Sequence, residues 1–109
     1  MQNYIKLDDF KKLELRIAKI IKVEDIPNKD KLYLITVSYG NEQSTIVSGI
    51  KPYYKKEELI GKKIVVIYNL EPKNFAGYPS NGMLLAVDDG TKVSLITIDR
   101  DVTEGSKVS

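Results

Sequence analysis

Apolar and polar side chains alternate along much of this chain, which is typical of β-strands with one buried face. In residues 14–23, apolar residues such as Ile17 and Val23 alternate with mostly polar neighbours, which predicts a long, half-buried strand. Ala18 and Ile20 interrupt its polar face, so we expect part of that face to be covered too. The same pattern predicts strands over residues 32–38, 44–48, 62–68, 83–88 and 93–98, and the tail 101–109 has room for one more short strand.

Two short helices are predicted outside these strands. Residues 7–13 form one helical turn, with Asp8 or Asp9 as its N-cap, because a carboxylate there accepts a hydrogen bond from a free backbone amide. Residues 55–59 form a second short helix that ends at Gly61. Turns are predicted at residues 25–31 and 39–42, and as a type I′ hairpin at Asp89-Gly90.

The stretch 69–85 begins where the strand 62–68 ends, and its prolines, glycines and asparagines are typical of a loop. A loop of this length between two strands is more often functional than a plain connection. Its side chains combine charge, stacking surface and soft apolar contact, in Lys73, Phe75, Tyr78 and Met83. The alternative is a surface connection whose aromatic rings pack onto the barrel.

Three strands, a short helix and two strands follow one another, which is the order of the oligonucleotide/oligosaccharide-binding fold, the OB-fold. We therefore predict an all-β protein: a five-stranded Greek-key barrel with a short helix between strands three and four. An N-terminal helical turn and extra C-terminal strands are added to it, and residues 1–109 form a single domain. This fold binds ligands along strands two and three, through the first hairpin, and through the loop between strands four and five.

The composition narrows the function classes. The chain has no Cys and no His, which removes disulfides, thiolate chemistry and the commonest general base and metal ligand. No apolar run approaches 18 residues and no signal-peptide pattern opens the chain, so we expect a soluble, cytoplasmic protein.

Charge is unevenly distributed along the chain. Residues 1–73 hold 14 Lys and Arg against 10 Asp and Glu, whereas residues 74–109 hold 3 against 5. A basic first two-thirds is compatible with a polyanionic partner. Lysine-rich surfaces are also common in thermophilic proteins, so this alternative stays open.

Catalytic and metal sites find little support. Adjacent carboxylates in a strand point to opposite faces, so Glu24/Asp25 and Asp88/Asp89 do not converge. The chain lacks a Gly-x-Ser-x-Gly elbow and a phosphate-binding glycine loop, and its acids lack the spacing of a calcium loop. We therefore expect no enzyme activity, no metal and no cofactor.

Residues suited to nucleic acid are more numerous. Lysines near the predicted binding face would neutralise phosphates: Lys22, Lys29, Lys31, Lys51, Lys55, Lys56 and Lys73. Aromatic rings would stack on unpaired bases, although tyrosines in a small barrel more often plug its ends: Tyr33, Tyr39, Phe75 and Tyr78. Side-chain donors and acceptors for phosphate, ribose or base edges are Asn28, Ser48, Asn69, Ser80 and Asn81. Together they favour RNA or single-stranded nucleic acid.

Five blocks in a fixed order, residues 9–20, 27–33, 46–50, 58–62 and 69–85, resemble the tRNA-binding domain family. This OB-fold module occurs at the C-terminus of methionyl-tRNA synthetases, in a stand-alone structure-specific tRNA-binding protein and in the endothelial monocyte-activating polypeptide group. The most specific block is Ser80-Asn81-Gly82-Met83-Leu84-Leu85. The resemblance covers nearly the whole chain.

The resemblance implies a non-catalytic protein that recognises the shape of tRNA. It also implies a homodimer, paired through the N-terminal helix and the strands after Asp88, and a role alone or as the trans-acting β-subunit of a methionyl-tRNA synthetase in protein biosynthesis. By match to the family's motifs, the candidate tRNA contacts are Asn28, Lys31, Ser48, Asn69, Ser80 and Met83, to which the residue chemistry adds Lys73 and Asn81. Tyr33, Phe75 and Tyr78 are the candidate stacking residues.

The chain departs from the family at two places. Ile26 stands where the family commonly has His, and residues 74–76 replace a basic cluster. For every phosphate that these positions no longer neutralise, the slope of log affinity against log salt concentration should become less steep by about one. Phe75 in place of a basic residue also favours a second hypothesis, a CsaA-type chaperone of the same family that holds unfolded polypeptides. A third is a dimerisation appendage without RNA binding.

Overall fold

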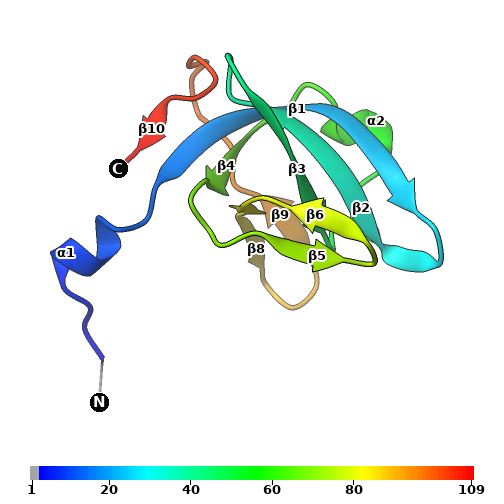
Figure 1. Cartoon of the computed structure of the whole chain (residues 1–109), viewed down its shortest axis with the longest axis horizontal. Helices are drawn as coiled ribbons and strands as arrows, with labels where there is room; N and C mark the ends of the chain where they lie inside the picture. Colours follow the sequence, from blue (N-terminus) through cyan, green and yellow to red (C-terminus); the bar gives the residue numbers. More distant parts are fainter. Residues whose placement is uncertain (1–2) are drawn as a thin grey trace.

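The computed structural model describes residues 3–109, and most of its regular structure is β-strand (Figure 1). The main sheet has the strand order β3-β2-β1-β4-β7, and β10 pairs with β1 beside this path. Its strands are β1 (Leu15–Ile26), β2 (Lys29–Ser38), β3 (Gln43–Ser48), β4 (Lys63–Ile67), β7 (Met83–Leu84) and β10 (Lys107–Val108). The predicted all-β class is confirmed.

β1 is the strand around which the barrel curls. Its first half pairs with β4, from Leu15 opposite Ile67 onwards, and its second half pairs with β2. A register shift between Ile20 and Lys22 marks the point where the strand bends, as β-bulges do. One strand therefore belongs to both walls of the barrel.

The barrel closes where β3 meets the end of the loop that follows β4. The backbone amide of Val47 donates to the Ser80 hydroxyl at 3.0 Å, and the backbone amide of Asn81 donates to the Thr45 carbonyl at 2.8 Å. These bonds cover the free edge of β3, as a closed barrel requires. The predicted OB-fold barrel is therefore the observed fold.

Shorter elements flank the barrel. They are α1 (Leu7–Phe10), α2 (Lys56–Leu59) and two hairpins, β5 (Lys73–Phe75) with β6 (Tyr78–Ser80) and β8 (Ala86–Asp88) with β9 (Val93–Leu95). In Figure 1, α1 stands clear of the barrel, and β10 lies beside the start of β1. No helix in residues 3–109 is long and apolar enough to cross a membrane.

The core forms from the alternating strand positions. Ala18 and Ile20 are fully buried, which confirms that the second face of β1 is partly covered. α2 adds Leu59, which is fully buried beneath the helix. The core cluster comprises Ala18, Ile20, Val23, Tyr33, Ile35, Val37, Tyr39, Ile46, Ile50, Leu59, Ile64, Val66, Leu84 and Leu95.

Three predicted local details are wrong. Lys6 is the N-cap of α1 and makes no side-chain cap, whereas Asp8 and Asp9 lie within the first turn, where the helix dipole favours acids. β1 runs on to Ile26 because Asp25 pairs with Tyr33 across the ladder. The turn after β8 spans four residues and is held by the Asp89 carboxylate, which accepts from the amides of Thr91 and Lys92, so it is not a two-residue type I′ turn.

Two longer segments also differ from the prediction. The strand expected over residues 83–88 is divided at Leu85, because β7 pairs with β4 whereas β8 pairs with β9. The loop after β4 contains the hairpin β5–β6, which the sequence did not predict. The loop is therefore folded over much of its length.

Candidate functional site

The loop between β4 and β7, residues 69–82, is fixed to the barrel at both ends. At its start, the Asn69 carboxamide accepts from the Glu14 backbone amide and donates to the Lys12 carbonyl, both at 2.8 Å. At its end, the Ser80 hydroxyl accepts from Val47 and lies 3.4 Å from the Gly82 carbonyl, to which it donates. These contacts hold the hairpin between them in place.

The hairpin β5–β6 places the loop's aromatic rings opposite one another. Phe75 pairs with Tyr78 across a turn in which Ala76 and Gly77 both have positive φ, 53° and 87°. The Phe75 side chain is 42% exposed, and Tyr78 is half-buried. The Phe75 ring is therefore available to a ligand rather than being part of the barrel core.

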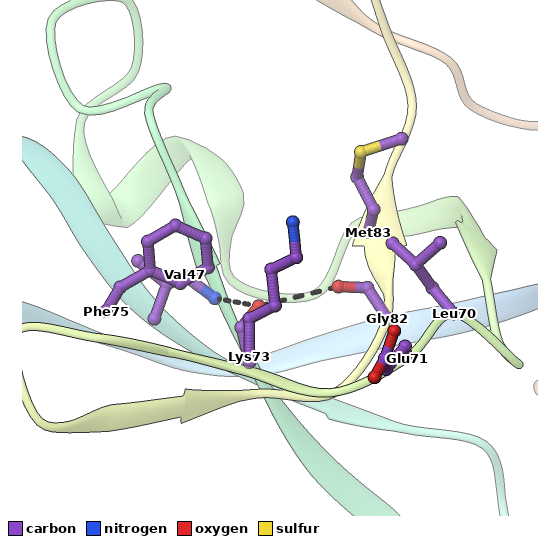
Figure 2. A pocket seen from close by; sticks show the side chains of 8 residues that line it. Val47, Leu70, Glu71, Lys73, Phe75, Gly82 and Met83 are labelled. Atoms are coloured by element: carbon purple, nitrogen blue, oxygen red, sulfur yellow. Dashed lines mark hydrogen bonds between the residues drawn. The ribbon is translucent and has the colours of Figure 1, made fainter.

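A pocket of about 170 Å³ lies between this hairpin and β7 (Figure 2). We call it the loop pocket; it is lined by Val47, Leu70, Glu71, Lys73, Phe75, Ser80, Gly82 and Met83. Figure 2 shows the Lys73 side chain extending between the Phe75 ring and the Met83 thioether. An apolar wall beside one ammonium group suits a flat ring attached to an anionic backbone, although the Glu71 carboxylate in the same lining opposes an anion.

Gly82 allows the chain to pass close to β4 beneath the loop pocket. Its φ is +104°, and a Cβ at this position would lie 2.7 Å from the Ile67 carbonyl oxygen. Any larger residue would push the segment 80–83 away from the barrel. The shape of the loop pocket therefore depends on a glycine at this position.

A second, basic surface surrounds the β1–β2 turn. Asp25 lies between Lys56 at 2.8 Å and Lys51 at 3.0 Å, and their hydrogen bonds, from Lys56 first, hold the pKa of its carboxyl below the ordinary value. Two of the predicted phosphate-binding lysines are thus partly neutralised. Within residues 3–109, the lysines without an ion pair include Lys29, Lys31, Lys55 and Lys73.

Comparison with known proteins identifies the family. The sequence model of the family described as "Putative tRNA binding domain" matches residues 15–107. This chain belongs to the tRNA-binding domain family. The matched domain is a binding module, although many relatives are named for the enzyme that contains it.

Relatives that match nearly the whole chain include methionine–tRNA ligases. The enzyme of Nanoarchaeum equitans is 59% identical over 100 residues, covering 92% of this chain and 13% of the enzyme. That of Pyrococcus abyssi is 54% identical over 105 residues, covering 96% of this chain and 14% of the enzyme. The chain therefore spans about one-seventh of the curated relatives' length, and is related to their C-terminal domain.

Solved structures of similar size share the whole fold. A MetRS-related protein from Pyrococcus horikoshii has a TM-score of 0.91 and 38% identity, with all of both chains covered. The chaperone CsaA from Bacillus anthracis has a TM-score of 0.89 and 27% identity, covering 98% of this chain and all of that one. A MetRS-related protein and a chaperone thus both occur among the structural neighbours.

The structure brings together some of the predicted tRNA contacts. Lys73, Phe75, Ser80 and Met83 all line the loop pocket. Ser80 is only 6% exposed and is engaged in closing the barrel, so it shapes the loop pocket more than it offers a free hydroxyl. Four lining residues were not among the predicted contacts, namely Val47, Leu70, Glu71 and Gly82.

The remaining predicted contacts lie elsewhere. Asn28 and Lys31 are exposed at the β1–β2 turn, where Asn28 supplies the positive φ of 64° that the turn needs. Ser48 ends β3 and pairs with Tyr33, one residue beyond the loop pocket's Val47. Both hydrogen-bonding groups of the Asn69 carboxamide are already engaged by the backbone of residues 12 and 14.

Tyr33 does not present a stacking face. Its side chain is 5% exposed within the core, and its hydroxyl donates to the Tyr54 carbonyl at 2.8 Å. The Lys51 ammonium lies 5.8 Å from the ring centroid and so occupies the outer side of the ring. Of the three predicted stacking residues, Phe75 and Tyr78 are those that the fold leaves accessible.

Proposed function

We propose that this chain binds tRNA through the loop pocket and the lysines around the β1–β2 turn. The observation that carries the proposal is that the fold gathers Lys73, Phe75 and Met83 in one pocket of a tRNA-binding family member. An unpaired base stacks on Phe75 and contacts the Met83 thioether, while Lys73 neutralises the adjoining phosphate. Asn28, Lys31 and Ser48 extend the contact towards the turn.

The acting unit in this proposal is a homodimer. Apolar side chains are exposed before the barrel, with Tyr4 87%, Ile5 74% and Leu7 65% accessible. Beside them, α1 and β10 border a groove of about 320 Å³ lined by Leu7, Phe10, Leu13 and Val108. In a symmetric dimer, the exposed apolar segment of each copy would lie in the groove of the other copy. Both apolar surfaces would then be buried.

If the chain binds tRNA, it acts in the cytoplasm, where tRNA is aminoacylated. The relatives carry this domain as a small part of methionine–tRNA ligases, so the chain acts either alone or in trans beside such a catalytic chain. In the second case it raises the local concentration of tRNA near the enzyme. Co-sedimentation with the methionine–tRNA ligase of the source organism distinguishes the two.

The deciding experiment is a salt titration of binding to total tRNA, with a single-stranded oligonucleotide and a denatured protein in parallel. We expect micromolar or tighter tRNA affinity, a log–log salt slope of several units and preference for tRNA over the single strand. Lys73→Ala should lower the slope by about one unit, whereas the matched control Lys92→Ala, in the β8–β9 turn, should not.

A second candidate function is the holding of unfolded polypeptides. Phe75, Ala76 and Tyr78 stand where the family commonly has basic residues, and two CsaA chaperones are among the structural neighbours. Binding of the denatured protein without salt-sensitive tRNA binding would support this candidate and overturn the tRNA proposal.

The dimer has its own test. Leu7→Asp places a charge in the groove without touching the core, because Leu7 is 65% exposed. Sedimentation equilibrium should show a dimer for the wild type and a monomer for this variant. Ile60→Asp, at a residue 53% exposed beside α2, is the matched control and should remain dimeric. A monomeric wild type would contradict the dimer.

A further inference from the structure

A second pocket, of about 250 Å³, lies beside the start of the loop and shares Leu70 with the loop pocket. We call it the Tyr39 pocket; its polar lining comprises Tyr39, Glu42, Gln43, Ser44, Tyr68 and Asn81. Tyr39 and Glu42 lie in the β2–β3 turn, and Gln43 and Ser44 begin β3. Tyr68 follows β4, and Asn81 lies near the end of the loop. Its size is just below the range of small-molecule sites, about 300–1,000 Å³, and suits one base rather than a large cofactor.

Two hydroxyls of this pocket make no hydrogen bond to the backbone or to a charged side chain in residues 3–109. The Tyr39 and Ser44 hydroxyl oxygens are buried, and among residues 3–109 neither has a hydrogen-bond partner except the other hydroxyl. Burial raises the pKa of Tyr39, while its hydrogen bond with Ser44 opposes that shift. Two buried hydroxyls that pair only with each other leave donor and acceptor capacity unused, which a bound ligand can satisfy.

The aromatic wall of the pocket is held in a fixed position. The rings of Tyr39 and Tyr68 meet edge to face, with centroids 5.0 Å apart and planes at 89°. The Arg16 guanidinium lies 4.7 Å from the Tyr68 centroid, and the Tyr68 hydroxyl donates to the Glu42 carboxylate. The pocket is thus pre-organised, which lowers the entropic cost of binding.

The lining chemistry selects against an anion and in favour of a neutral, planar ligand. Within the described residues, no Lys or Arg lines the Tyr39 pocket, and Glu42 would repel a phosphate. Leu70 and Pro72 offer apolar contact, while the Gln43 and Asn81 carboxamides offer donors and acceptors. The second oxygen of Glu42 accepts only, so it requires a donor such as an exocyclic amine.

We propose that the Tyr39 pocket receives one unstacked base of the bound RNA, an adenine, cytosine or guanine whose amine donates to Glu42. The inference rests on the proposed function and gives Asn81 a role: its carboxamide reads the base edge. Uracil has no exocyclic amine, and its one base donor, N3–H, is flanked by two carbonyl oxygens that the carboxylate repels, so uracil binds more weakly. A base held here and another in the loop pocket would lie on either side of Leu70.

The test uses nucleosides, which carry no phosphate and so bypass the lysine surface. Adenosine and cytidine, titrated into ¹⁵N-labelled protein, should shift the backbone amide signals of Ser44 and Asn81, and uridine should shift them far less. The double variant Ser44→Ala/Asn81→Ala should lose these shifts. Asn74→Ala, which removes an exposed carboxamide of the same loop outside both pockets, should keep them. Equal shifts with uridine, or none with any nucleoside, would overturn the inference.

Affinity for tRNA separates this inference from the function on which it rests. The double variant should bind tRNA about tenfold more weakly, the loss expected for one or two hydrogen bonds, at an unchanged salt slope. If tRNA binds the wild type and the double variant equally, the inference fails and the proposed function stands. If the wild type binds no tRNA, the proposed function fails, and the nucleoside titration still decides what the Tyr39 pocket accepts.

Discussion

The carboxamide oxygen of Asn69 accepts a hydrogen bond from the backbone amide of Glu14 at 2.8 Å, which joins the end of β4 to the residue before β1. The same side chain donates to the Lys12 carbonyl. The start of the loop and the segment between α1 and β1 are therefore fixed by one residue. This structural role is one reason for an asparagine at this position of the family motif.

Replacing Asn69 should weaken the fold more than replacing a neighbouring carboxamide. Asn69→Ala removes two hydrogen bonds to the backbone, and we expect a loss of about 1–3 kcal/mol in the free energy of unfolding, measured by urea titration. Asn74→Ala, whose side chain is exposed in β5, should change it by less than about 0.5 kcal/mol. Equal stabilities of the two variants would show that the Asn69 contacts contribute nothing.

Gly82→Ala tests the close approach beneath the loop pocket. The variant places a Cβ 2.7 Å from the Ile67 carbonyl oxygen at a φ of +104°, so both backbone strain and a steric clash oppose it. Gly77→Ala has nearly the same φ, +87°, but its Cβ meets nothing within 4 Å in residues 3–109. The control costs about 1 kcal/mol of strain, and Gly82→Ala should cost at least about 1 kcal/mol more. Calorimetric unfolding of both variants measures the difference, and equal losses would exclude the clash.

Asp25 restrains two lysines of the basic surface, so removing its charge should strengthen RNA binding. Asp25→Asn frees Lys51 and Lys56 from their ion pairs at 3.0 and 2.8 Å. The affinity for tRNA should rise, and the salt slope should increase by about one to two units, one for each freed phosphate contact. Asp101→Asn, which releases Lys63 instead, is the control and should leave the slope unchanged. An unaltered slope in Asp25→Asn would place the RNA away from the β1–β2 turn.

The same carboxylate makes stability depend on pH in the acid range. Hydrogen bonds from Lys56 and then Lys51 lower the pKa of Asp25 below its ordinary value of 3.8. The ionised carboxylate therefore stabilises the folded state above that value, and this contribution is lost as the pH falls through the lowered pKa. The wild type should unfold at a higher urea concentration than Asp25→Asn, and this difference should grow up to about pH 4 and then stay constant. At high salt the difference should grow less with pH. A constant difference across this range would mean that the ion pairs do not stabilise the fold.

Alternation of side chains predicted the barrel strands because it reports burial directly. Tyr33 shares the parity of Ile35 and Val37, all of them buried, so the same pattern already indicated that Tyr33 belongs to the core rather than to a stacking surface. The residue type suggested stacking, but the position of Tyr33 in the strand places its ring in the core.

The hairpin β5–β6 could not be predicted in the same way. Lys73, Asn74 and Phe75 are all exposed, and Pro79 stands in the facing strand, so neither segment shows alternation. Its support is tertiary: Thr45 donates to the Pro79 carbonyl at 2.8 Å, across 34 residues of sequence. The Asn69 contact with Glu14 spans 55 residues, and the Tyr39 pocket likewise joins separate segments. A single sequence does not reveal which of these positions meet.

Substitution of Phe75 should distinguish tRNA binding from the binding of unfolded polypeptides. Phe75→Arg restores a positive charge at a position where the family commonly has one, on a side chain that is 42% exposed and lines the loop pocket. If the loop pocket binds RNA, tRNA affinity should rise and the salt slope should increase by about one unit, because one more phosphate is neutralised. If Phe75 instead holds unfolded chains, the variant should lose its ability to suppress aggregation of a denatured protein, since the apolar contact is gone.

Val87→Arg adds the same charge at a residue 54% exposed on β8 and controls for net charge. Equal gains in tRNA affinity in both variants would remove the loop pocket from the RNA-binding surface.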